Sequence, residues 1–145
     1  MTEQGVQVTT PRVVLFDFDG VLVRGDTFAM FMRDRYARAG WRKGLVLLLS
    51  PWFLLVLPFS RRRVLRSLVH LGLLGLNEVR YRDLAQAFAV ALVRQPGHFC
   101  RDGLGALRRH QADGDRIVVV TGCEESLVRS VLAELGGLGV EVLAS

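Results

Sequence analysis

Cysteine is nearly absent from this chain. Its two cysteines, Cys100 and Cys123, form no CxxC pair. Disulfide frameworks need several paired cysteines and an oxidising compartment, so this usage favours a reducing, cytosolic environment. The first eleven residues are polar and lack the apolar core of a signal peptide. We therefore expect residues 1–11 to form a flexible tail.

Lysine is equally scarce, and the basic charge is gathered in one segment. Lys43 is the only lysine, and Asp34 is the only acidic residue between residues 33 and 66, where arginines abound. The basic character behind the net charge of +5 is therefore local to this segment, and it bears on what this segment binds. Its cations bracket an apolar block and do not line a polar groove with interleaved aromatics, so a nucleic acid is not an expected partner.

Three apolar stretches predict strands of a parallel α/β core. They are residues 13–16, 116–122 and 139–145, and the first suits a strand buried on both faces. The stretch between the first two looks helical, with Thr27 and Asn77 as helix caps. Further helices are expected over residues 98–111 and 124–135. The pattern predicts a core formed by residues 12–26 and 113–145, interrupted by a helical insert over residues 27–112.

Two aspartates follow the first strand directly, in the stretch LFDFDGVL. Side chains alternate along a strand, so Asp17 and Asp19 project to the same side at its carboxyl end. Two such carboxylates are tolerable if they share a divalent cation or if one holds a proton. Gly20 lets the backbone leave the strand. Thr121 and Gly122, which end the second strand, offer a hydroxyl and free amides to a phosphate.

LFDFDGVL and VVVTG resemble the first and second motifs of the haloacid dehalogenase-like phosphatases. The long helical insert resembles the cap of subclass IB, and the nearest resemblance is to the bacterial phosphatidylglycerophosphatase C-like group. This resemblance implies a Rossmann-like sheet with a helical cap inserted after the first strand. It also implies hydrolysis of phosphomonoesters through an aspartyl-phosphate.

The resemblance implies roles for individual residues. Asp17 would be the nucleophile, and Asp19 would be the general acid for the leaving alcohol and later the base for water. Mg²⁺ would bind the Asp17 carboxylate and the Asp19 carbonyl. The expected phosphate-binding and substrate-binding residues are Thr121, Gly122, Gly20 and Asp26. For Asp26, a charge at a helix N-terminus is an equally good account.

The resemblance also exposes what is missing after Thr121. Such phosphatases need a third-motif Lys or Arg and fourth-motif aspartates, yet the only later cation is Arg129 and the only later acids are glutamates. The strands that would flank the first strand on its other side are missing too. We therefore expect a C-terminally truncated phosphatase, essentially inactive and marginally stable, with its first strand at a sheet edge.

An apolar run inside the insert carries no charge from Gly44 to Ser60. As one helix it would measure about 25 Å, short of a hydrocarbon core of about 30 Å, and Pro51 would kink it. Basic residues flank it on both sides, and Trp41 and Trp52 suit interface depth. Residues 41–63 are therefore expected to contact an anionic membrane surface. A buried cap helix with solvated flanks is the alternative.

These observations favour a Mg²⁺-dependent phosphomonoesterase acting on a lipid phosphate, such as phosphatidylglycerophosphate. Its expected location is the cytoplasmic face of the bacterial inner membrane, with the cytoplasm as the alternative. A soluble small-molecule phosphatase of the phosphoserine type is one competing hypothesis. A membrane-associated binding protein without turnover is another. The sequence leaves the oligomeric state open.

Overall fold

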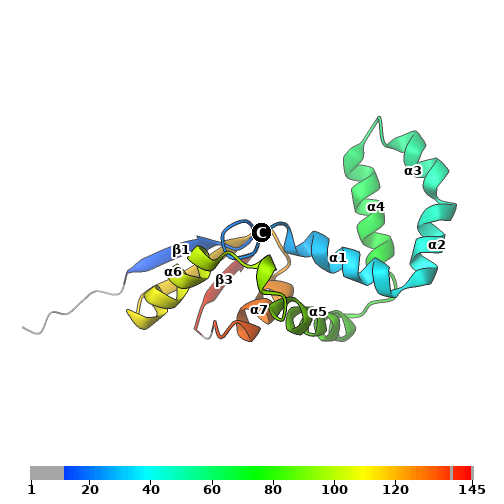
Figure 1. Ribbon diagram of the computed structural model, residues 1–145. Helices are drawn as coiled ribbons and strands as arrows, with labels where there is room; N and C mark the ends of the chain where they lie inside the picture. The colour runs from blue at the N-terminus through cyan, green and yellow to red at the C-terminus, as the bar shows by residue number, and fades with distance from the viewer. Residues whose placement is uncertain (1–11, 138, 145) are drawn as a thin grey trace, which may run out of the picture.

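The computed structural model describes residues 12–137 and 139–144, so the predicted tail lies outside the described residues. The strands in these ranges are β1 (Val13–Asp17), β2 (Arg116–Thr121) and β3 (Glu141–Ala144). The helices are α1 (Thr27–Arg38), α2 (Gly40–Leu48), α3 (Ser50–Val56), α4 (Arg61–Leu73), α5 (Glu78–Val93), the 3-10 turn η1 (Pro96–His98), α6 (Arg101–Ala112) and α7 (Glu125–Glu134). The strands are parallel in the order β1-β2-β3 (Figure 1), which confirms the predicted α/β fold.

Helix caps decide where several elements begin. Asn77 caps α5 as predicted, because its side chain accepts a hydrogen bond from the Arg80 amide. The cap of α1 is Asp26, whose Oδ1 accepts from the Ala29 amide at 2.9 Å, and the prediction of Thr27 was wrong by one residue. Helix α6 begins later than predicted, because the chain first forms η1 and then an extended segment in which Phe99 bridges to Val23.

The core lies on one face of the sheet. Phe16, Val119 and Val142 point from the three strands into a buried cluster that includes side chains of α6 and α7. Both helices connect strands that advance in the same direction across the sheet, and right-handed crossovers place such helices on the same face. Helix α6 falls in the range predicted for the insert, but it packs on the sheet beside α7. It is therefore part of the core and not of the insert.

The opposite face of the sheet is open in the part of the chain that the structure describes. Val13 and Leu15 of β1 are 59% and 66% exposed, and Val120 and Leu143 continue this apolar surface across β2 and β3. The prediction that β1 is buried on both faces was therefore wrong. No described strand pairs with the outer edge of β1, which lies at the edge of the sheet as expected.

Helices α2, α3 and α4 form a hairpin that projects away from the sheet (Figure 1). The predicted kink is present, since α2 ends at Leu48 and α3 begins at Ser50, with Pro51 in its first turn. Leu48 and Phe59 are 75% and 86% exposed, while Phe53 of the same run is buried, so most of the apolar run is open in the part of the chain that the structure describes. Among residues 12–137 and 139–144, no helix has the length and hydropathy that crossing a membrane requires.

Candidate active site

The carboxyl ends of β1 and β2 bring Asp17 of the first predicted motif next to the second motif, whereas Asp19, Gly20 and Asp26 do not line the cleft between them. Asp17 is paired in register with Val120, so its neighbour on β2 is followed directly by Thr121. Asp17, Thr121 and Gly122 line one cleft of about 350 Å³, together with Leu15, Phe16 and Val120. The structure therefore places the predicted nucleophile beside the predicted phosphate-binding residues.

A tight turn after β1 fixes the backbone between the two aspartates. Phe18 is fully buried, and its carbonyl accepts from the amides of Leu22 and Val23. The Gly20 amide donates to the Val23 carbonyl at 2.7 Å, and Gly20 has a φ of +88°, which side chains resist. Gly20 is therefore needed for the shape of this turn, while its contact with a phosphate stays a prediction.

Thr27 holds the side chain of Asp19. The Thr27 amide and hydroxyl both donate to Oδ1 of Asp19, at 3.0 and 2.6 Å, and Thr27 is completely buried. The sequence analysis had assigned Thr27 to a helix cap and missed this contact. One sequence feature could have indicated this contact: a threonine stands at the start of a helix, eight residues after the second aspartate.

The side chain of Cys123 lies near Asp19, close enough for the carboxylate to affect the pKa of the thiol. Burial is the main reason that the pKa of the Cys123 thiol rises to about 12, and the nearby carboxylates of Asp19 and Asp26 raise it further. Cys123 therefore remains a neutral thiol at physiological pH. Asp26 caps α1, and its contact with substrate stays a prediction.

The end of β2 presents a hydroxyl and an exposed glycine to the cleft. Thr121 is 3% exposed, and its Oγ1 accepts from the Cys123 amide at 2.9 Å. A hydroxyl that accepts in this way can still donate its own hydrogen to a phosphoryl oxygen. Gly122 lies two residues before Glu124, whose carboxylate already caps α7 by accepting from the Ser126 and Leu127 amides. The strand end therefore offers an anion the Gly122 backbone and not the helix N-terminus.

The charged residues after Thr121 are engaged elsewhere. Arg129 binds Glu125 at 2.7 Å, and Glu141 binds Arg116 at 2.7 Å. The other two acids are Glu134, which accepts from Gln86, and Glu124, which caps α7. Neither Arg129 nor these glutamates line the Asp17 cleft.

The residues present fit part of a magnesium site. Mg²⁺ takes oxygen ligands, and among the described residues no donor is hydrogen-bonded to the Asp17 carboxylate, which leaves its oxygens open to a cation. The Asp19 main-chain carbonyl is the second expected ligand. A separate group, His110, Asp113 and Asp115, has potential ligand atoms within 4.8 Å of one another, but lies where α6 leads into the start of β2.

Comparison with known proteins decides the family. The family model for haloacid dehalogenase-like hydrolases matches residues 14–145. The chain belongs to this family. Protein CicA from two strains of Caulobacter vibrioides, NA1000 / CB15N and ATCC 19089 / CIP 103742 / CB 15, is 29% identical to it over 133 residues. The match covers 92% of this chain and 57% of each relative, so the chain spans little more than half their length. No solved structure matches.

This match confirms the predicted superfamily, which is a family of hydrolases. It agrees with the parallel sheet and with the position of Asp17 at the end of its first strand. The subclass, the phosphatase activity and the lipid substrate are finer statements, and they are taken up as proposals below.

Proposed function

We propose that this protein hydrolyses phosphomonoesters through a phosphorylated Asp17. The observation that carries the proposal is the cleft in which Asp17 meets Thr121 and Gly122. A carboxylate beside a hydroxyl and a backbone amide suits the transfer of a phosphoryl group from substrate to protein. Membership of a hydrolase family supports this chemistry.

The proposed reaction has two displacements at phosphorus. An Asp17 oxygen attacks the phosphorus atom, the bond from phosphorus to the leaving oxygen breaks, and Asp19 gives that oxygen a proton. Water then attacks the phosphorus of the aspartyl-phosphate, Asp19 takes a proton from the water, and inorganic phosphate leaves with Asp17 restored. Because Thr27 donates twice to Oδ1 of Asp19, the transferred proton belongs on Oδ2.

Charge neutralisation would come from Mg²⁺, held by the Asp17 carboxylate and the Asp19 carbonyl. Thr121 and the Gly122 amide would bind the phosphoryl oxygens. The described residues offer the cleft no third-motif cation, because Arg129 does not line it. The 145-residue chain should therefore be essentially inactive on phosphomonoesters, with turnover at most very slow, since electrostatic stabilisation dominates phosphoryl transfer.

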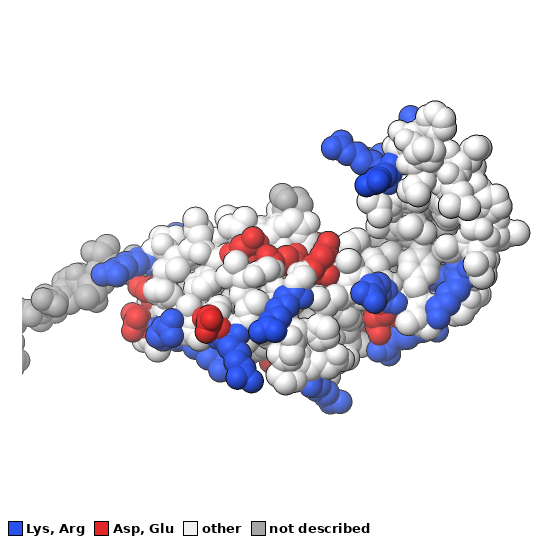
Figure 2. Space-filling model, turned by 45° about the horizontal axis from the view of Figure 1, so that its top comes forward, with Lys and Arg blue, Asp and Glu red and all other residues white. Residues whose placement is uncertain are grey.

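The proposed substrate is a lipid phosphate, reached from the cytoplasmic face of a bacterial inner membrane. Support comes from the cap tip, which we define as the apolar side chains of residues 41–59 and the adjoining basic residues. Its most exposed large apolar residues are Leu47, Leu48, Leu54, Leu55 and Phe59. Figure 2 shows Lys and Arg side chains beside a largely uncharged surface at this end.

An exposed apolar surface with flanking cations fits an anionic bilayer. Lys43 precedes the apolar run, and Arg61, Arg62 and Arg63 follow it and are exposed. Each cation close to an anionic surface contributes about 1 kcal/mol. With no membrane-spanning helix among the described residues, the proposed contact is interfacial. A phosphatidylglycerophosphatase-like activity, of subclass IB, is the specific form of this proposal.

A second candidate function is a membrane-associated protein that binds a phosphate without turnover. The lining of the phosphate cleft favours it, because no lysine or arginine is among the described residues that line the cleft. A soluble phosphatase of the phosphoserine type is less well supported, because it gives no reason for the exposed apolar cap tip.

The test is phosphate release from acetyl phosphate, a reactive phosphoryl donor that suits a slow enzyme. We expect release that needs Mg²⁺, is suppressed by EDTA and is lost in Asp17→Asn. Asp83→Asn, which changes an exposed aspartate on α5, should behave as the unchanged protein. Release that persists in Asp17→Asn would remove Asp17 as the nucleophile. Phosphate binding without release would favour the second candidate.

A further inference from the structure

A cavity at the base of the helical hairpin gathers three arginines. Its volume is about 370 Å³, and it lies where α1 leads into α2 and where α4 leads into α5 (Figure 1). Arg35, Arg42 and Arg80 line it from α1, α2 and α5, and Asp83 is the one acid among the described lining residues. Three positive charges and one negative charge leave the lining with a net charge of +2. The cavity shares no lining residue with the Asp17 cleft.

Arg42 places a positive charge in the interior. It is 7% exposed, and among residues 12–137 and 139–144 no carboxylate forms an ion pair with it. Nη2 donates to the Leu74 carbonyl at 3.1 Å, and the guanidinium carbon lies 4.6 Å from the centre of the Trp41 ring. A carbonyl and an aromatic ring stabilise a cation only in part, and a buried charge without a counterion is costly.

Arg35 adds a second positive charge close to the first. Its Nε donates to the Gly72 carbonyl at 3.2 Å. Burial lowers the pKa of Arg35, and the nearby charge of Arg42 lowers it further, because the two guanidinium groups repel each other. Arg80 is exposed near the start of α5, and in the described part of the chain neither it nor Arg35 is paired with a carboxylate.

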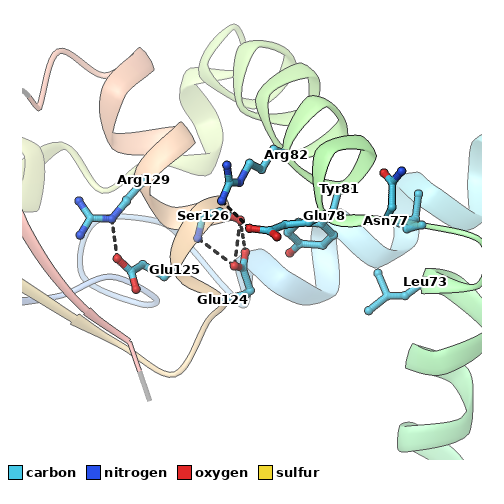
Figure 3. Close-up of a pocket in the computed structure, with 10 residues that line it drawn as sticks. Leu73, Asn77, Glu78, Tyr81, Arg82, Glu124, Glu125, Ser126 and Arg129 are labelled. Atoms are coloured by element: carbon cyan, nitrogen blue, oxygen red, sulfur yellow. Dashed lines mark hydrogen bonds and ion pairs between the residues drawn. The ribbon is translucent and has the colours of Figure 1, made fainter.

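Arginines in a neighbouring cavity are compensated in the usual way. Figure 3 shows that cavity, in which Arg82 is paired with Glu78 and Arg129 is paired with Glu125. The arginines at the base of the hairpin differ from these neighbours, because they gather around open space without a paired counterion in the structure as described. An anion in this space would supply the missing charge.

We propose that this cavity binds a phosphate group, carried either by free phosphate or by the headgroup of a lipid. Guanidinium groups offer paired N–H donors that match phosphate oxygens, and a phosphate dianion balances a net charge of +2. Because the three arginines come from three helices, a bound phosphate would hold α1, α2 and α5 together. The inference does not depend on the proposed hydrolysis at Asp17.

Enough donors remain for such a ligand. A guanidinium has five N–H groups, and Arg35 and Arg42 each use one nitrogen to donate to a carbonyl. Of the unpartnered nitrogens of Arg42, only Nε is sealed from solvent, so a phosphate would approach Nη1. Both Nη atoms of Arg35 and the exposed guanidinium of Arg80 complete the set.

The experiment titrates the 145-residue chain with two probes in separate arms. One is inorganic phosphate, and the other is short-chain phosphatidylglycerol below its micelle concentration, a phosphodiester that the proposed reaction does not cleave. NMR follows the amides of Gly75 and Leu76, which line this cavity, and of Gly122, which lines the Asp17 cleft. We expect the Gly75 and Leu76 signals to shift, and the probe that binds more tightly identifies the source of the phosphate. Acetate at equal ionic strength should leave them nearly unchanged.

Variants assign the binding to the arginines. Arg80→Gln should weaken binding of the probe about tenfold, because a charge-assisted hydrogen bond is lost. Arg82→Gln removes the same charge two residues later on α5 and should keep the binding. Arg42→Met tests the buried cation, since phosphate should raise the melting temperature of the unchanged protein but not of this variant. Should Arg42→Met fail to fold, Arg80→Gln at its exposed position carries the test.

Three results would overturn the inference. The first is a shift confined to Gly122, which would place the phosphate in the Asp17 cleft and leave the proposed function intact. The second is equal binding in Arg80→Gln and Arg82→Gln. The third is a phosphate-dependent rise in melting temperature that persists in Arg42→Met, which would show that Arg42 only supports the end of α4.

Discussion

Thr27 donates from its amide and from its hydroxyl to the same oxygen, Oδ1, of Asp19. The two bonds occupy Oδ1 of Asp19 and leave Oδ2 for the proposed proton transfers. Thr27 is completely buried at the first position of α1, so the cap and the loop after β1 are joined at this contact. Thr27 is therefore a positioning residue for the proposed proton transfers.

Replacing Thr27 with valine should slow the loss of phosphate from phosphorylated Asp17. The change removes the hydroxyl bond but keeps the volume, and misplacing an acid-base group costs up to about 100-fold. Thr27→Ser should restore most of the rate. The measurement is the decay of a phosphoryl label on the protein, with phosphate binding followed in parallel. Equal decay in Thr27→Val and the unchanged protein would show that Asp19 is oriented by other contacts.

Cosedimentation with vesicles should depend on the cap tip. Changing Arg61, Arg62 and Arg63 to glutamine should weaken binding to anionic vesicles, and salt should weaken it as well. The control changes Arg108 and Arg109, exposed on α6, to glutamine and should have little effect. Equal binding to neutral and anionic vesicles at all salt concentrations would refute the electrostatic part. Apolar insertion alone would then remain.

Gly103 and Gly105 on α6 should respond in opposite ways to alanine. A Cβ at Gly103 would collide with the backbone carbonyl of Val21, which belongs to the turn after β1. Gly103→Ala should therefore lower the melting temperature and disturb that turn. A Cβ at Gly105 meets nothing closer than Arg109 at 3.7 Å, so Gly105→Ala should stabilise α6 by up to about 1 kcal/mol. Matching melts of the two variants would contradict this close packing.

Acid should destabilise the fold through two carboxylates, that of Asp115, which is largely covered, and that of Glu141, which is exposed. A hydrogen bond with His110 is the main cause that lowers the pKa of Asp115, and one from Arg116 lowers that of Glu141. A carboxyl group whose pKa is lower in the folded protein than in the unfolded chain stabilises the fold at pH values above the unfolded pKa. This stability is lost as the pH falls through the folded pKa. The ordinary values are 3.8 and 4.5.

Thermal melts between pH 6 and pH 3 test this expectation. The melting temperature should fall mainly below the ordinary pKa values of the two groups. Asp115→Asn and Glu141→Gln should each make the fall smaller, with Asp102→Asn as an exposed control on α6. A fall of the same size in all of these variants would exclude the two pairs as its cause.

Local patterns were enough to predict the three strands and the helical character of the insert, although not the start of every helix. Asn77 capped its helix as expected, and the apolar runs before Asp17 and Thr121 became parallel neighbours. The Asp17 and Thr121 cleft followed from these elements, because the carboxyl ends of parallel strands share one edge of the sheet.

Features that depend on packing between distant segments were not predictable in this way. An apolar β-branched run does not reveal whether a second layer covers it, so the exposure of Leu15 was missed. The position of Thr27 at the start of a helix suggested a capping role within that helix, but its hydroxyl donates instead to Asp19. Tyr81 and Glu124 meet only because α5 packs against α7.

The central claim is that Asp17 becomes phosphorylated, and chemical trapping of the acyl phosphate tests it most directly. The protein is mixed with acetyl phosphate and Mg²⁺, quenched in acid and reduced with borohydride, which converts a phosphorylated aspartate to homoserine. Peptide mass spectrometry then locates the converted residue. We predict homoserine at position 17, with none when Mg²⁺ is removed by EDTA. Phosphate release without any conversion at Asp17, or conversion at another aspartate alone, would contradict the account.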